Sequence, residues 1–206
     1  MRALLTATVF VVLGVGSPPC RAGEPPPRRA RTSVALLAGY GLQLDSVLSS
    51  GVSAYRFGFG TRAGVTLPCG GYLGGAFVTH TGTNVAGSRS GASTYVSLAH
   101  ASYLGPELGF DFEVWRLLLR PSVGSGLLLT LGKTAVATTS VSDDHAFIFV
   151  SPGAVVAYRF GEWFVGADLH LPIVPAQPSK QWAATALLTL GTTFGGGGGG
   201  VTGRPR

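Results

Sequence analysis

The sequence has few charged residues and, beyond its N-terminus, no long apolar run. Asp, Glu, Lys and Arg make up 12% of the 206 residues, whereas 46% are hydrophobic. Soluble domains contain about 25% charged residues. A spanning helix needs about 20 consecutive apolar residues, and Gly, Thr, Ser and Arg interrupt every stretch. Apolar composition without apolar runs favours membrane strands, which present only alternate residues to lipid.

Cysteine is scarce, with only Cys20 and Cys69 in the chain. Removal of an N-terminal signal would leave Cys69 alone, so that no internal disulfide could form. The histidines are scattered without the spacing of metal ligands, at positions 80, 100, 145 and 170. We therefore expect no metal site and no cofactor.

The net charge of +6 belongs to the two ends of the chain. Residues 1–31 hold five arginines and one glutamate, and residues 201–206 hold two arginines. Between these ends, eight basic and eight acidic side chains balance. A nucleic-acid-binding domain carries a basic patch on its folded surface, so we expect no nucleic-acid partner.

The N-terminus has the pattern of a secretory signal peptide over residues 1–22. Arg2 supplies the positive start, residues 3–16 form an apolar stretch, and small residues precede a cleavage point after Ala22. An anchoring helix is the weaker interpretation because the run is too short. A lipidated Cys20 is also disfavoured, since Pro precedes it. Residues 23–32 then form a Pro- and Arg-rich linker.

From residue 33 onward, segments with a two-residue period alternate with turn-rich spacers. The clearest segment is 55–67, with Tyr55, Phe57 and Phe59 on one face and glycines and arginines on the other. About eight such strands are predicted: 33–45, 55–67, 72–81, one within 95–112, 116–131, 147–160, 163–172 and 181–194.

Short and long spacers alternate along the chain. Tight turns are expected near 67–71, 113–115 and 161–162, and longer Ser-, Thr- and Gly-rich loops at 45–54, 81–94, 131–145 and 173–180. This alternation is typical of outer-membrane barrels. We predict an all-β fold, a transmembrane antiparallel up-and-down β-barrel over residues 33–194. Its termini would be periplasmic, and its long loops would face an unknown extracellular ligand.

Aromatic residues occur near the predicted strand ends. Trp and Tyr are enriched where a membrane meets water, so these residues are expected to form two girdles on the outer surface. The predicted interface aromatics are Tyr55, Phe112, Trp115, Phe160, Trp163, Trp182 and Phe194.

The charged residues share the small, Gly-rich face of the strands. An Arg facing lipid at the midplane would cost about 2–4 kcal/mol, which predicts that this face is the interior. His170 has the same orientation as its neighbour Asp168. The predicted lumen ion-pair network comprises Arg56, Arg62, Glu107, Asp111, Arg120, Arg159 and Asp168. Such a network would largely plug the lumen; inward glycines such as Gly58 and Gly64 would leave space for the alternative, a narrow channel for small solutes.

The chain resembles the small outer-membrane barrels of the OmpA, OmpX and OmpW kind over roughly residues 32–194. The resemblance rests on the Tyr-Leu-Gly-Pro-Glu-Leu-Gly-Phe-Asp-Phe strand at 103–112 and on the terminal strand ending at Phe194. It implies residence in the bacterial outer membrane and insertion by the barrel-assembly machinery. Unlike the family pattern, residues 195–206 follow that Phe as a Gly-rich tail, which is expected to be flexible.

One motif suggests catalysis. Some small outer-membrane barrels are lipid A deacylases with a His-x-Ser pair, and His100 and Ser102 have that spacing. A serine nucleophile also needs an orienting acid, and Glu107 has the opposite orientation. We therefore expect a structural or surface-interaction role rather than an enzyme, with lipid A modification as the weaker alternative.

Overall fold

The computed structural model describes residues 30–44, 54–82, 85–89, 93–136, 139–175 and 183–195. The predicted signal peptide and most of the linker and tail lie outside these ranges. The described residues form ten strands: β1 (Arg31–Gln43), β2 (Phe57–Thr66), β3 (Gly71–Thr81), β4 (Val85–Arg89), β5 (Ser93–Phe110), β6 (Phe112–Val114), β7 (Leu117–Val136), β8 (Thr139–Phe160), β9 (Trp163–His170) and β10 (Ala183–Phe194). None of the described residues belongs to a helix that could span a membrane.

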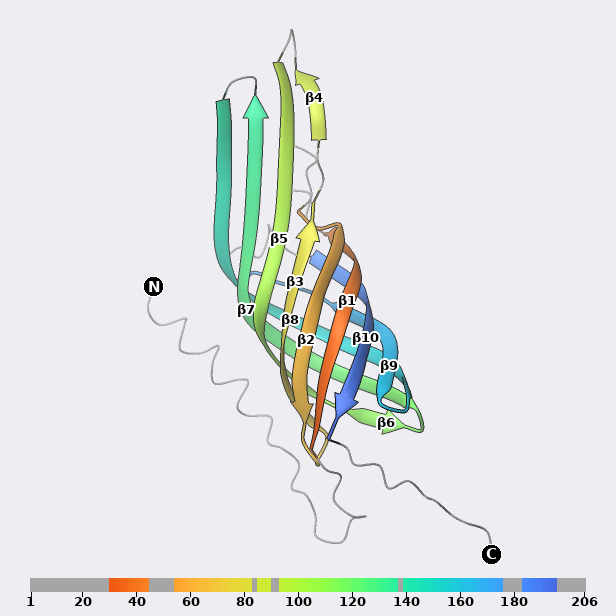
Figure 1. The fold of residues 1–206 in the computed structure, drawn as a ribbon. Helices are drawn as coiled ribbons and strands as arrows, with labels where there is room; N and C mark the ends of the chain where they lie inside the picture. Colours follow the sequence, from red (N-terminus) through yellow and green to blue (C-terminus); the bar gives the residue numbers. More distant parts are fainter. Residues whose placement is uncertain are drawn as a thin grey trace, which may run out of the picture.

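Eight of these strands close into an antiparallel barrel (Figure 1). Neighbours in sequence pair with one another, and β1 pairs with β10 to close the ring. The two short strands extend this pattern, because β4 pairs with the start of β5 and β6 pairs with the start of β7. The predicted fold class, an up-and-down barrel of about eight strands, is confirmed.

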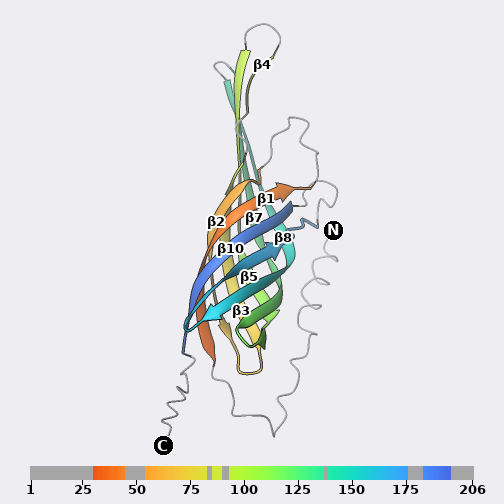
Figure 2. The ribbon, with the colours of Figure 1, turned by 90° about the vertical axis from the view of Figure 1, so that its right-hand side faces the viewer.

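One end of the barrel, here called the turn end, holds three tight connections. They occupy residues 67–70, 115–116 and 161–162, where short turns were predicted. Trp115 and Gly161 have positive φ angles of 57° and 69°, a conformation that two-residue hairpin turns require. Strand β1 begins and β10 ends at the same end, where Thr32 pairs with Phe194 (Figure 2).

The opposite end, here called the hairpin end, carries two β-hairpins that rise above the barrel (Figures 1 and 2). Strands β7 and β8 pair from Leu117↔Tyr158 up to Val136↔Thr139, and β4 pairs with β5. The predicted loops at 81–94 and 131–145 were therefore largely wrong. Their Ser- and Thr-rich residues pair as strands that continue past the barrel wall. Most of the predicted loops at 45–54 and 173–180 lies outside the described residues.

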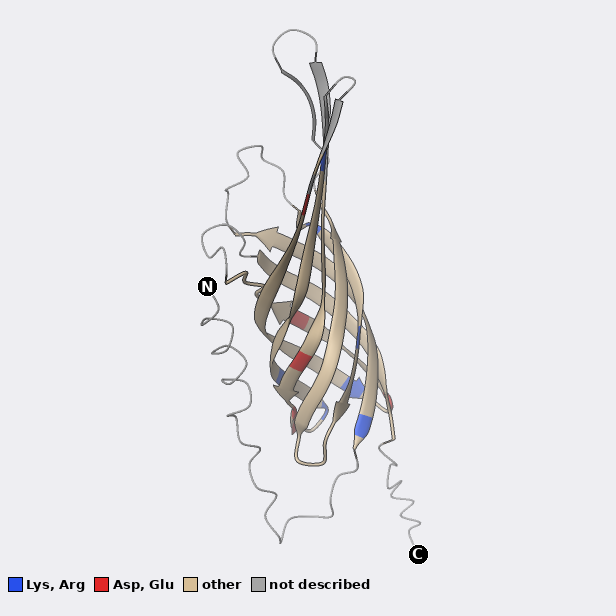
Figure 3. Cartoon of the chain, turned by 90° about the vertical axis from the view of Figure 1, so that its left-hand side faces the viewer, with Lys and Arg blue, Asp and Glu red and all other residues tan. Residues whose placement is uncertain are grey.

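The barrel is apolar outside and mixed inside. On β10, Leu188 and Leu190 are 70% and 48% exposed, whereas Leu187 and Thr189 are almost fully buried. A soluble barrel exposes polar residues to water and buries apolar ones. In this barrel the outer surface is apolar, and charged side chains such as Arg62 and Asp168 are buried inside. Figure 3 shows how few charged positions the barrel wall carries.

Candidate functional site in the barrel lumen

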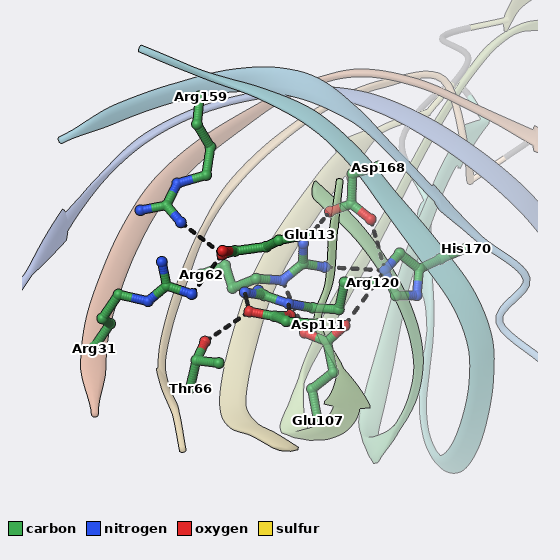
Figure 4. Close-up of polar contacts among 10 residues, drawn as sticks. All are labelled: Arg31, Arg62, Thr66, Glu107, Asp111, Glu113, Arg120, Arg159, Asp168 and His170. Atoms are coloured by element: carbon green, nitrogen blue, oxygen red, sulfur yellow. Dashed lines mark hydrogen bonds and ion pairs between the residues drawn. The ribbon is translucent and has the colours of Figure 1, made fainter. Parts of the chain in front are cut away.

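The centre of the lumen holds a buried ion-pair group. Arg62 on β2 lies 2.8 Å from Glu107 through Nε–Oε2 and 2.7 Å from Asp168 through Nη1–Oδ2. His170 Nε2 lies 2.7 Å from Asp168 Oδ1. These side chains come from β2, β5 and β9 and converge across the barrel (Figure 4). Because each is nearly inaccessible to solvent, their charges are compensated mainly by one another.

His170 also contacts Ser151, whose Oγ lies 3.4 Å from Nδ1. A Ser–His–carboxylate chain is the arrangement that activates a serine nucleophile. Here, however, Arg62 approaches the same ring nitrogen that faces Asp168, at 2.9 Å, and also pairs with that carboxylate. Asp168 is therefore already paired with Arg62. The geometry fits a structural ion-pair group better than a nucleophile.

A second group lies nearer the turn end. Arg120 donates from Nε to Asp111 Oδ1 at 2.5 Å and from Nη2 to Oδ2 at 3.0 Å. Thr66 donates to the same carboxylate at 2.8 Å. The guanidinium of Arg120 lies 3.5 Å from the ring centroid of Tyr72, a cation–π contact. Two-point pairing and stacking together fix the Arg120 side chain in one orientation.

A third group closes the turn end. Glu113 on β6 accepts hydrogen bonds from Arg31 at the start of β1 and from Arg159 on β8 (Figure 4). The bond from Arg159 is 2.6 Å long. Between this group and the second lies a cavity of only about 10 Å³, room for about one water molecule.

In the half of the lumen toward the hairpin end, rings and aliphatic side chains pack together. Ring centroids lie 5.3 Å apart for Tyr55 and His80, 6.1 Å for His80 and Tyr103, and 5.5 Å for Tyr103 and Phe149. Leu128 is fully buried in the same cluster. The sequence indicated inward glycines and charges but did not reveal this cluster of rings and aliphatic side chains.

Several inward glycines make room for rings rather than for water. A Cβ placed on Gly64 would lie 2.4 Å from the Tyr72 hydroxyl oxygen, and one on Gly58 would lie 2.4 Å from His80 Nδ1. The expectation that these glycines leave open space was therefore wrong at both positions, because a ring from β3 occupies each space.

Six of the seven predicted lumen charges lie in these three groups. The exception is Arg56, which is exposed. Just before β2, Tyr55 turns into the lumen against His80, so the two-residue alternation breaks and Arg56 points out. The prediction missed Arg31 and Glu113, which were assigned to a linker and a turn. Glu113 does have the same orientation as Asp111, which could have identified it.

The predicted interface aromatics divide by position. Those at the turn end are exposed on the outer surface: Phe112, Trp115, Phe160, Trp163 and Phe194. Tyr55 was wrongly placed outside, since it is 5% exposed and belongs to the lumen cluster. Trp182 lies outside the described residues.

The structure places Glu107, the acid considered for the His-x-Ser pair, away from that pair. Ser102 Oγ lies 2.8 Å from Thr79 Oγ1 on the neighbouring strand, whereas Glu107 lies in the lumen beside Arg62. Within the described ranges, no cluster of three or more His, Cys, Asp or Glu side chains could hold a metal ion.

No protein-family model matches the chain, and no curated protein is similar in sequence. A major outer membrane protein of Thermus thermophilus superposes with a TM-score of 0.56 at 10% identity, over 80% of this chain and 99% of that one. The attachment invasion locus protein Ail of Yersinia pestis gives 0.49 at 14% identity, covering 81% and 99%. The N-terminal barrel domain of Pseudomonas aeruginosa OprF gives 0.48 at 16% identity, covering 79% and 97%. The chain has the fold of the small eight-stranded outer-membrane β-barrels.

Proposed function

We propose that the protein is an outer-membrane barrel with a closed lumen and a structural or surface-interaction role. The observation that carries this proposal is the filling of the lumen in both halves. The charged groups around Arg62 and Arg120 occupy the half toward the turn end, and the cluster around Tyr103 and Phe149 occupies the other.

A passing ion would have to separate contacts of 2.7–2.8 Å around Arg62. Each separated partner would become an unpaired buried charge, which is strongly unfavourable. The ion would then meet the rings of the other half, where the described cluster contains no carboxylate or guanidinium group. Eight-stranded barrels are also just wide enough for side chains to fill. These features support a plug over the alternative of a narrow solute channel.

Planar-bilayer recording tests the closed lumen. Purified protein inserted into a bilayer is expected to give no stepwise conductance, with a general porin inserted in parallel as the positive control. Reproducible conductance steps from the wild-type protein would contradict the plug and favour the channel.

We further propose that the turn end faces the periplasm and the hairpin end faces the outside. The short turns and both ends of the barrel sequence lie together at the turn end (Figure 2), which is the arrangement of bacterial outer-membrane barrels. The β4–β5 and β7–β8 hairpins would then meet an extracellular ligand. The barrel-assembly machinery would read β10, which ends at Phe194.

A catalytic role is not part of the proposal. The hydroxyl of Ser102 is close to Thr79 rather than to a carboxylate-supported base. Lipid A from wild-type cells and from His100→Ala cells should give identical mass spectra. A difference in acylation between the two would support an enzyme instead.

A further inference from the structure

The outer wall near the hairpin end is hollowed along β10. The pairing registers place Tyr40 beside Ala186 and Leu42 beside Ala184 on one side of that strand. On its other side, Leu169 pairs with Ala186. Leu169 also pairs with Ala154 of β8. Large side chains of β1 and β9 therefore stand beside alanines of β10 and β8, which form the floor of the recess. The resulting groove has a volume of about 420 Å³, within the range of small-molecule sites.

The groove ends toward the barrel midplane at Leu188. This residue follows Ala184 and Ala186 on the same face of β10 and is 70% exposed. The distance along the strand from Ala184 to Leu188 is about 13 Å, at about 3.3 Å per residue. Along β10, the recess is thus bounded on the midplane side by the Leu188 side chain.

The groove lies within the lipid-facing apolar surface rather than above it. Leu42 and Leu169 are 58% and 50% exposed, and Leu44, further toward the hairpin end, is 55% exposed. His170 also borders the groove, but its imidazole is turned into the lumen toward Asp168. The lining is therefore mainly apolar and suited to hydrocarbon.

We propose that this groove, the acyl-chain groove, holds one saturated acyl chain of a membrane lipid in the leaflet next to the hairpin end. The proposal rests on the membrane placement proposed above. In a bilayer an unfilled recess would lose dispersion contacts on its whole lining, and a straight hydrocarbon chain can reach the alanine floor. A second barrel would instead touch the projecting Leu42 and Leu169 side chains and leave the floor uncovered.

Native mass spectrometry tests the groove. The protein is reconstituted in dimyristoyl phosphatidylethanolamine vesicles, released in mild detergent and measured for bound lipid. Wild-type protein should retain one lipid. The Ala186→Leu variant, which fills the floor, should lower the lipid-bound fraction at least threefold. The matched Ala63→Leu variant places the same side chain on the exposed outer face of β2, outside the groove, and should behave as wild type.

Equal lipid retention in Ala186→Leu and wild type would overturn the proposal, as would wild-type protein that retains no lipid. A wild-type dimer that Ala186→Leu abolishes would assign the groove to a second copy and would also overturn it. Gel mobility of unboiled samples identifies folded barrels in every variant. Wild-type protein that never enters the vesicles would contradict the membrane placement itself.

Discussion

At the residue scale, Arg62 decides the charge balance of the lumen centre. It is the common partner of Glu107 and Asp168, so its loss would leave two buried carboxylates without their counter-charge. We predict that Arg62→Met lowers the free energy of unfolding by about 3–5 kcal/mol, the usual cost of removing one partner of a buried pair. Urea unfolding in lipid vesicles, followed by tryptophan fluorescence, measures this change.

The control for this prediction is Arg116→Met. Arg116 lies in an exposed turn and contacts the hydroxyl of Tyr158 at 3.3 Å. Exposed polar contacts contribute little to stability, so the variant should unfold close to wild type. Equal stability of Arg62→Met and Arg116→Met would contradict the buried network.

Gly64 tests how tightly the rings of the lumen pack. A methyl group there would lie 2.4 Å from the Tyr72 hydroxyl oxygen, and Tyr72 is itself held under Arg120. Overpacking of this kind costs about 1–3 kcal/mol, and Gly64→Ala should lower the unfolding free energy by that amount.

Gly124→Ala is the matched comparison, measured by the same urea titration. The nearest atom to its added Cβ is the Pro106 carbonyl oxygen at 3.6 Å, an ordinary contact. Equal destabilisation of Gly124→Ala and Gly64→Ala would contradict a tight contact between Gly64 and the Tyr72 ring.

At the element scale, the turn end and the hairpin end carry positions suited to a topology measurement. Cys69 is a partly exposed free thiol in the 67–70 turn, and Ser142 is exposed on the β7–β8 hairpin. In intact cells, a membrane-impermeant maleimide should label Ser142→Cys but not Cys69. Permeabilising the outer membrane should then expose Cys69.

The Cys69→Ser variant shows which signal comes from that turn. Labelling of Cys69 in intact cells, together with protection of Ser142→Cys, would reverse the proposed orientation. Any labelling that persists in Cys69→Ser would come from Cys20 and would contradict removal of the signal peptide.

The sequence predicted strands well where they cross the apolar layer. Segments such as 72–81 and 163–172 agree with β3 and β9 within two residues, because lipid imposes an apolar residue at every second position. The hairpins above the barrel were missed because water on both faces imposes no such alternation.

The candidate site was predictable in part for the same reason. Side chains alternate between the two faces of a strand, so the position of a charged residue along the strand shows whether it faces inward. This alternation identified Arg62, Glu107 and Asp168. The alternation does not hold before a strand begins, as at Tyr55 and Arg56, which precede β2. The alternation also does not show which inward side chains meet across the lumen, so the contact between Tyr103 and Phe149 could not be predicted from the sequence.

At the scale of the whole molecule, the outer and inner surfaces of the closed sheet carry different kinds of side chain. The outside is apolar and ends in exposed aromatics such as Trp115 and Trp163 at the turn end. The inside pairs its charges and packs its rings. Such a barrel is stable only with hydrocarbon around it, because a continuous apolar wall of this extent would aggregate in water.

Outer-membrane fractionation followed by gel electrophoresis of boiled and unboiled samples tests this central claim most directly. A closed barrel resists detergent at room temperature, because each of its eight wall strands is paired on both sides. We predict that the protein is recovered in the outer-membrane fraction and that its unboiled band migrates apart from its boiled band. Recovery as a soluble periplasmic protein, with one band under both conditions, would contradict the account.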